Sequence, residues 1–161
     1  MIRDATISDA ERLSSIYAEA IAAGAATPHV TPPGLAEFKA WLFDEAATYH
    51  VAVATDEGGI HGWCAIRRFH ERAAYSPTGE LLVYVAGARQ GHGQALVSQS
   101  LEAARAMRLH SLVVLASGHE EFLAGGAHRL GFVKSGQLPA ALRGAPIGVF
   151  QIMLSQQEGA R

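Results

Sequence analysis

The feature that most constrains the fold is an unbroken strand, loop and helix between residues 80 and 107. The apolar run ELLVYV predicts a β-strand, and apolar residues recur at the spacing of one helix face after the loop ARQGHGQAL. That helix face consists of Val97, Leu101, Ala104 and Met107. A strand that passes directly into an amphipathic helix commits the chain to packing a helix against a sheet, which is α/β architecture.

Two helices are expected before this unit. Ser8 followed by Glu11 has the form of a capping box, and apolar residues then recur at helical spacing until Gly24. The stretch ATPHVTPPGLAEF, residues 26–38, contains three prolines and predicts a loop. A second helix follows it, with an apolar face made of Leu35, Phe38, Trp41 and Leu42.

The remaining segments supply strands. YHVAVAT and IHGWCAIRRF, joined by the turn DEGG, predict a β-hairpin. SLVVLA is apolar on both faces, as in a central strand, EEFLAGGAHRLGF predicts a short helix broken at Gly131, and GVFQIML predicts a last strand. The expected order is β-α-α-β-β-β-α-β-α-β-β, an α/β sandwich. It forms one domain of residues 1–155, followed by a polar tail at residues 156–161.

Composition restricts the partner to a small molecule. The 161 residues carry 13 basic and 15 acidic side chains, so no basic field is present to hold nucleic acid or an anionic membrane. The single cysteine, Cys64, excludes an intrachain disulfide and a cysteine cluster for zinc. The N-terminus lacks the apolar core of a signal peptide, and no segment is long enough to span a bilayer. A soluble cytoplasmic protein is therefore expected.

The glycine loop admits two interpretations. Gly91 and Gly93 lack Cβ atoms, so backbone N–H groups can approach a phosphate closely, and the helix that starts nearby adds its partial positive charge. The alternative is a tight strand-to-helix turn that uses glycine for its geometry alone. The lysine of a P-loop and the third glycine of a dinucleotide-binding loop are both missing, so those two phosphate loops are excluded.

Several segments resemble the GNAT N-acetyltransferases, and more narrowly the phosphinothricin acetyltransferase subfamily. QGHGQA, residues 90–95, fits Gln/Arg-x-x-Gly-x-Gly/Ala, the pyrophosphate loop of that family, and HRLGF, residues 128–132, resembles the end of its last conserved helix. RAAYSPTGELLVYV, residues 72–85, is similar to the Arg-x-Ala-Tyr-x-x-Thr-x-Glu-x-x-x-Tyr-Val segment of the subfamily. The first 21 residues also resemble its N-terminus, so the resemblance covers nearly the whole chain.

The resemblance implies the GNAT fold, a central mixed and mostly antiparallel sheet flanked by helices. It also implies acetyl transfer from acetyl coenzyme A to the primary amine of a small amino-acid-like acceptor, such as phosphinothricin, methionine sulfone or methionine sulfoximine. Main chain near Val83, Tyr84 and Val85 would hold the coenzyme arm. The expected loop contacts to the coenzyme are Arg89, Gln90, Gly91, His92, Gly93, Gln94 and Ala95. No metal is expected, because no histidine pair has HExxH spacing.

Glu80 is the candidate catalytic base, since an ammonium group must lose a proton before it can attack a thioester. A solvated carboxylate at the start of a strand is the alternative interpretation of this residue. Arg72 is expected to pair with a carboxylate or phosphinate of the acceptor, while Phe69 and Tyr75 would line its pocket. The alternative for the two aromatic residues is an ordinary place in the core.

Two further pairs of residues are possible contacts of the acceptor. Arg67 and Arg68 are consistent with the polar face of a strand, although they also border the expected pocket. His29 and Thr31 fall near a segment that, by the resemblance, closes over the acceptor.

The resemblance fails at three positions after SLVVLA. The subfamily has an Asn, a Ser three residues later and a His or Tyr before the Leu-Gly-Phe, and Glu120, Leu123 and Ala127 stand there instead. The coenzyme thiol, with a pKa of about 8.5, can leave without a protein acid.

Besides acetylation of a small amino acid, two functions remain: a sensor that binds acyl coenzyme A without turnover, and acetylation of a peptide N-terminus. Relatives with this fold suggest a homodimer.

Overall fold

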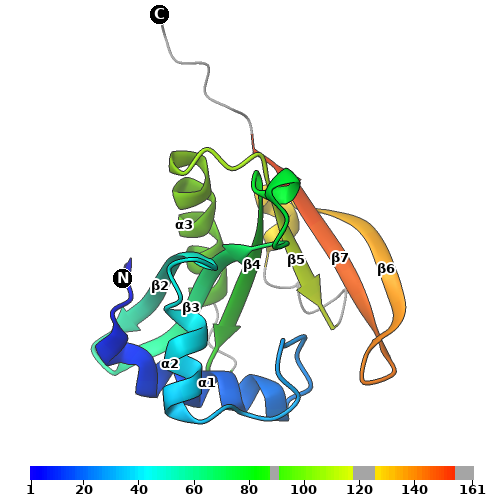
Figure 1. Ribbon diagram of the computed structural model, residues 1–161. Coiled ribbons are helices and arrows are strands. Elements are labelled where there is room, and N and C mark those ends of the chain that lie inside the picture. The colour runs from blue at the N-terminus through cyan, green and yellow to red at the C-terminus, as the bar shows by residue number, and fades with distance from the viewer. Residues whose placement is uncertain (88–90, 118–125, 155–161) are drawn as a thin grey trace, which may run out of the picture.

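A seven-stranded sheet forms the centre of the molecule (Figure 1). The computed structural model describes residues 1–87, 91–117 and 126–154. The strands are β1 (Ile2–Asp4), β2 (Thr48–Asp56), β3 (Gly59–Arg68), β4 (Thr78–Val85), β5 (Ser111–Ala116), β6 (Val133–Leu142) and β7 (Ala145–Met153). Their order in the sheet is β1-β2-β3-β4-β5-β7-β6, and neighbours are antiparallel except for the parallel pair β4 and β5.

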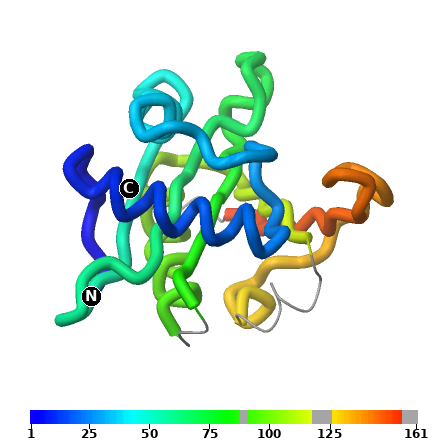
Figure 2. Tube along the Cα trace, turned by 90° about the horizontal axis from the view of Figure 1, so that it is seen from below, coloured from blue at the N-terminus to red at the C-terminus, as the bar shows by residue number. Residues whose placement is uncertain are grey.

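Helices cover both faces of this sheet. α1 (Ala10–Ala22) and α2 (Leu35–Leu42) lie on one face, and α3 (His92–Ala106) lies on the other, as the view from below shows (Figure 2). Three short 3-10 turns complete the described elements: η1 (Ile7–Asp9), η2 (Ala73–Tyr75) and η3 (Ala127–Leu130). Because side chains alternate along a strand, the sheet separates two cores. Leu82 of β4 is buried under α1 and α2, whereas its neighbour Leu81 is buried under α3.

The parallel pair opens soon after it forms. β4 and β5 are paired only from Thr78 to Glu80, opposite Ser111 to Val113, although β4 continues to Val85. Figure 1 shows the two strands side by side at their upper ends and well apart at their arrowheads. Beyond Glu80, the inner edges of both strands therefore have no strand partner in the sheet. Backbone groups on such an edge need partners from elsewhere.

The expected element order and the α/β class are confirmed for the residues that the structure describes. The hairpin, the strand before the glycine loop and the helix after it all form where their patterns predict. The helix predicted near residues 120–130 is only partly testable, because residues 118–125 lie outside the described ranges. The part that is described, η3, is a 3-10 turn that ends at Gly131 with a φ of 98°. The expected tail at residues 156–161 also lies outside those ranges.

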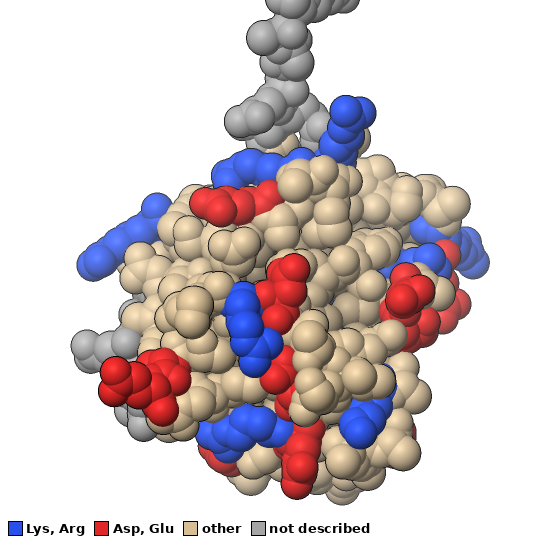
Figure 3. All heavy atoms as spheres, turned by 90° about the vertical axis from the view of Figure 1, so that its left-hand side faces the viewer, with Lys and Arg blue, Asp and Glu red and all other residues tan. Residues whose placement is uncertain are grey.

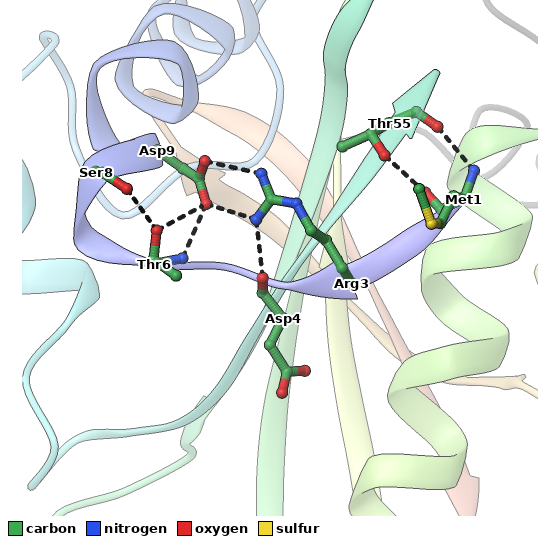
Figure 4. Close-up of polar contacts among 7 residues, drawn as sticks. All are labelled: Met1, Arg3, Asp4, Thr6, Ser8, Asp9 and Thr55. Carbon is green, nitrogen blue, oxygen red and sulfur yellow. Dashed lines mark hydrogen bonds and ion pairs between the residues drawn. The ribbon is translucent and has the colours of Figure 1, made fainter. Parts of the chain in front are cut away.

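The predicted capping box at the first helix is wrong in its residues. Instead of Ser8 and Glu11, the Asp9 carboxylate accepts the backbone N–H of Thr6 at 2.9 Å, so the box begins two residues earlier. The guanidinium of Arg3 on β1 donates to both Asp9 oxygens, at 2.8 and 2.9 Å (Figure 4). This hydrogen-bonded ion pair lowers the pKa of Asp9 to about 2. The helix start is thus fixed by a residue of the neighbouring strand, which a local pattern does not contain.

The surface charge is of mixed sign on one face of the molecule. On the face that carries the β1 edge, acidic and basic side chains alternate and do not gather into a single basic patch (Figure 3). Among the described helices, none has both the length and the apolar character needed to cross a membrane.

Candidate active site

The first half of the candidate site is the inner edge of β4 beyond Glu80. The Ala86 N–H donates to the His61 carbonyl at 2.8 Å, so the backbone of Ala86 bonds toward β3. Hydrogen-bonding positions alternate along an antiparallel strand, and Val83 and Val85 therefore point their backbone groups toward the opening beside β5. An extended ligand can bind there as an additional strand.

The glycine loop follows this edge and leads into α3. Gly91 has a φ of 95°, a conformation that residues with a Cβ rarely adopt, so geometry alone accounts for this glycine. Gly93 lies inside the helix, and a Cβ there would meet only the Val85 side chain at 3.7 Å, an ordinary contact. Neither turn geometry nor packing among the described residues explains Gly93. A ligand that approaches the backbone closely does explain it, and this favours the phosphate interpretation of the loop.

His92 is the first residue of α3 and does not simply face solvent. Its ring is half-buried and stacks against the ring of His61, with centroids 5.5 Å apart. Its Nδ1 atom is buried and has no hydrogen-bond partner among the described residues. Of the other residues expected to contact the coenzyme, Gln94 and Ala95 lie exposed in the first turn of α3. Arg89 and Gln90 lie outside the described residues.

Glu80 lies where the parallel pairing ends, on the sheet face covered by α1 and α2. It shares that face with Leu82 and Tyr84, which belong to the core beneath these helices. Burial raises the pKa of Glu80, and the positive charge of Arg67 acts against that rise. A carboxylate with a raised pKa that adjoins an opening in the sheet is suited to accept a proton from an amine.

Arg67 occupies the position on β3 directly opposite Glu80. Its guanidinium lies over the indole of Trp41 from α2, 4.5 Å from the ring centroid, and its Nε donates to the Thr48 hydroxyl at 3.0 Å. Burial lowers the pKa of this guanidinium, while the charges of Glu80 and Asp44 oppose the effect. The site therefore contains one carboxylate and one guanidinium at opposite positions of adjacent strands.

A third set of contacts fixes the proline-rich loop over this face. The Tyr17 hydroxyl of α1 lies 2.9 Å from His29 Nδ1, and the backbone N–H of His29 also reaches that hydroxyl, at 3.3 Å. Tyr84 donates its hydroxyl to the Ala26 carbonyl at 3.0 Å. Arg143, at the turn between β6 and β7, donates to the loop carbonyl of Val30 at 3.1 Å. The loop thus bridges α1, β4 and the β6–β7 hairpin.

Burial makes the hydroxyl groups of the two tyrosines in this region less acidic than usual. It raises the pKa of Tyr17 to about 12, and it raises the pKa of Tyr84 further, with contributions from Tyr17 and Glu80. Both hydroxyls remain protonated at neutral pH and can act as hydrogen-bond donors. Tyr17 also stacks on Trp41, with ring centroids 5.4 Å apart. Aromatic walls and fixed hydroxyl groups are typical of a pocket for a small ligand.

The three residues expected to bind the acceptor form a separate, exposed group after β3. Phe69 is 39% exposed and Tyr75 is 45% exposed, with ring centroids 6.2 Å apart. Neither belongs to the buried core, which removes the alternative interpretation that the sequence left open. Arg72 is exposed at the start of η2, and its side chain has no hydrogen bond or ion pair among the described residues.

The positions where the sequence departs from the family pattern are described only in part. Glu120 and Leu123 lie outside the described residues. Ala127 is buried in η3 and offers no proton donor. The described residues also contain no group of three or more side chains that could hold a metal ion.

Sequence reasoning did not assign Trp41 or Tyr17 to the site, and it left Arg67 between the polar face of a strand and the border of the pocket. For Arg67 a signal was present, because residues at alternate positions of its strand, Trp63 and Ala65, are apolar and face the core. An arginine that continues such a face is buried beside it. No comparable signal links Tyr17 to His29, since their contact depends on how the loop folds back over α1.

Comparisons with known proteins agree with this geometry. Residues 13–132 match the model of the acetyltransferase (GNAT) family. The L-methionine sulfoximine/L-methionine sulfone acetyltransferase of Pseudomonas aeruginosa is 34% identical over 143 residues, covering 86% of this chain and 83% of that protein. The structure of a phosphinothricin acetyltransferase from Sinorhizobium meliloti in complex with acetyl coenzyme A superposes with a TM-score of 0.87 at 25% identity, covering 100% of this chain and 91% of that one. A ribosomal-protein-alanine N-acetyltransferase from Brucella melitensis gives a TM-score of 0.85 at 28% identity, covering 96% and 99%.

Proposed function

The chain belongs to the acetyltransferase (GNAT) family, and from this premise we propose that it acetylates the primary amine of a small amino acid, with acetyl coenzyme A as the donor. Two of the similar proteins name methionine sulfoximine, methionine sulfone or phosphinothricin as acceptor, and a third names the alanine of a ribosomal protein. The observation that carries the proposal is Glu80, a partly buried carboxylate at the point where β4 and β5 separate.

The inner edge of β4 and the glycine loop would bind the coenzyme. Val83 and Val85 would hold its pantetheine arm through main-chain hydrogen bonds, as an added strand does, whereas Tyr84 between them pairs with Trp63 of β3. The residues from Arg89 to Ala95 would bind its pyrophosphate at the N-terminus of α3. Gly93 supports this role. Among the described residues no neighbour is close enough to require a glycine there, and a ligand that approaches the backbone would account for it.

Direct attack in a ternary complex requires few groups. Glu80 takes a proton from the acceptor ammonium, directly or through water, and the free amine attacks the thioester carbonyl. A carbon–nitrogen bond forms, the carbon–sulfur bond breaks, and the thiol leaves as a thiolate without a protein acid. The second proton of the attacking nitrogen then passes to this thiolate, directly or through water. Backbone N–H groups of Val83 and Val85 would stabilise the negative charge that develops on the carbonyl oxygen.

The test is release of free thiol from acetyl coenzyme A across a panel of amines. The panel contains methionine sulfone, methionine sulfoximine, phosphinothricin and a short peptide, and thermal shift with acetyl coenzyme A is measured in parallel. We expect a thermal shift, together with thiol release for the amino acids. A thermal shift without thiol release from any amine would instead favour a domain that binds acyl coenzyme A as a sensor, consistent with the missing donor at Ala127.

We further propose a cytoplasmic homodimer. The strand β6 is exposed at every position from Val133 to Ala141, with Val133 64% and Leu138 48% exposed. An edge strand with apolar groups on its surface is prone to pair with another chain, and a second copy is the simplest partner. Light scattering is expected to give the mass of a dimer for the wild type and the mass of a monomer for Leu138→Asp.

A further inference from the structure

Glu80 and Arg67 are placed as a pair of unlike charges that do not neutralise each other. They occupy opposite positions on the adjacent strands β4 and β3, and both lie on the face covered by α1 and α2. Residues at opposite positions of an antiparallel pair have Cβ atoms roughly 5 Å apart. Even so, no ion pair of 4.0 Å or less joins the two side chains, which leaves both charges available to a ligand.

The contacts of Arg67 hold the guanidinium in place without using its terminal nitrogens. Its Cζ atom lies 4.5 Å from the centroid of the Trp41 ring, and among the described residues only Nε is hydrogen-bonded, to the Thr48 hydroxyl at 3.0 Å. Neither Nη1 nor Nη2 has a hydrogen-bond partner among the described residues. A half-buried guanidinium with two free parallel donors has the geometry that binds a carboxylate through two hydrogen bonds.

An amino acid presents the complement of this pair, because its ammonium and carboxylate groups are attached to one carbon atom. We propose that Arg67 binds the α-carboxylate of the acceptor while Glu80 accepts the proton of its α-ammonium group. This proposal rests on the acetyltransferase function above and specifies its substrate class. It selects free α-amino acids and disfavours peptide N-termini, in which the same carboxylate has become an uncharged amide.

The proposal also moves the carboxylate contact from Arg72 to Arg67. The Arg72 side chain is exposed at the start of η2 and has no hydrogen bond or ion pair among the described residues, so a ligand that binds it must restrict its rotamers. Arg67 is already held by Trp41 and Thr48 and lies opposite the base. A pre-positioned donor gives the stronger discrimination, and Arg72 remains available to the distal polar group of the acceptor.

The experiment compares methionine sulfone with its methyl ester and its primary amide, using kcat/KM from thiol release. The wild type is expected to favour the free acid over both blocked forms by about 10-fold to 100-fold, the range for a hydrogen-bonded charge pair. Arg67→Gln is expected to lower kcat/KM for the free acid only, so that the free acid is preferred by about threefold at most. Arg68→Gln, at the exposed neighbouring position, is the matched control and should keep the wild-type ratio. Any effect of blocking on amine basicity is common to all variants and cancels in the comparison.

Several outcomes would overturn the proposal. One is a wild-type kcat/KM ratio of free acid to blocked forms near one. Another is a wild-type ratio that persists in Arg67→Gln. A third is a ratio that falls to near one in Arg72→Gln and not in Arg67→Gln. If Arg67→Gln fails to fold, as judged by loss of the thermal shift with acetyl coenzyme A, Arg67→Lys replaces it. That variant keeps the charge but loses the two-donor geometry, and the ratio should still fall. Absence of thiol release from every amine would refute the acetyltransferase function itself, which is a distinguishable result.

Discussion

The two halves of the candidate site are built from different parts of the polypeptide. The coenzyme half, from Val83 to Ala95, uses backbone groups of a strand edge and a helix N-terminus that follow each other in the chain. The acceptor half uses side chains from α1, α2, β3 and β4, so residues as far apart in sequence as Tyr17 and Glu80 contribute to it. A backbone site tolerates changes of side chain, whereas the acceptor half can change its specificity by single substitutions.

The largest expected effect comes from Glu80, where the halves meet. Glu80→Gln should lower kcat by roughly 100-fold to 10,000-fold while the affinity for acetyl coenzyme A stays within about twofold. Because burial raises the pKa of Glu80, the wild-type rate should fall on the acidic side at a pH above that of an ordinary glutamate, and the variant should lose this limb. Rate profiles between pH 4 and 9 would measure both effects. Glu57→Gln, in the exposed turn of the β2–β3 hairpin, is the control.

The same substitution should stabilise the fold near neutral pH. A carboxyl group whose pKa is higher in the folded state binds protons more tightly there, so its contribution to the free energy of unfolding falls as pH rises through that pKa. Glutamine removes the buried charge. The melting temperature of Glu80→Gln should therefore equal or exceed that of the wild type at pH 8, and a large decrease would show that the carboxylate is structural.

The two glycines of the loop separate structure from function within the coenzyme half. Gly93→Ala places a Cβ on a helix in ordinary contact with the Val85 side chain, and alanine is more favourable than glycine in a helix by about 1 kcal/mol. If the backbone at this position approaches phosphate, the variant should be at least as stable yet bind acetyl coenzyme A about 10-fold or more weakly. Gly91→Ala, at a φ of 95°, should instead lose about 1–2 kcal/mol of stability. Calorimetric titration and thermal melts of both variants would distinguish the two roles. Unchanged affinity for acetyl coenzyme A in Gly93→Ala would contradict a close approach of the Gly93 backbone to phosphate.

A smaller effect is expected in the acceptor half at Tyr17. Tyr17→Phe removes the hydroxyl that contacts His29 by two hydrogen bonds but keeps the ring that stacks on Trp41. Loosening the loop should raise KM for the amino acid about 5-fold, the effect of one hydrogen bond, with no change in the affinity for acetyl coenzyme A. Initial rates at varied acceptor concentration give the measurement. An equal loss of coenzyme affinity would mean that the loop supports both halves.

The contrast between local and distant contacts also explains what could be predicted from sequence. The β4 strand, its loop and α3 form one continuous segment, so their pattern predicted the elements, and their resemblance to the GNAT family predicted the ligand class. Arg67 and Trp41 come from different elements, and only the packing of α2 on the sheet brings them together. The exposure of Phe69 is a further example, because a pattern of apolar residues cannot show where the chain leaves the sheet.

The smallest expected effect lies away from the site, at the start of the first helix, where a distant contact again replaces the predicted local one. Sequence alone favoured Ser8 with Glu11 as the capping pair, whereas Asp9 binds both Thr6 and the β1 residue Arg3 (Figure 4). Asp9→Asn should cost about 1 kcal/mol of stability at pH 7, and Glu11→Gln should cost almost nothing. The pKa of Asp9 is lowered to about 2, so its contribution is complete above pH 4 and is lost as pH falls through 2. Chemical denaturation should therefore show a difference between wild type and Asp9→Asn that closes between pH 4 and pH 2. A larger loss in Glu11→Gln would restore the local capping pair and contradict the long-range one.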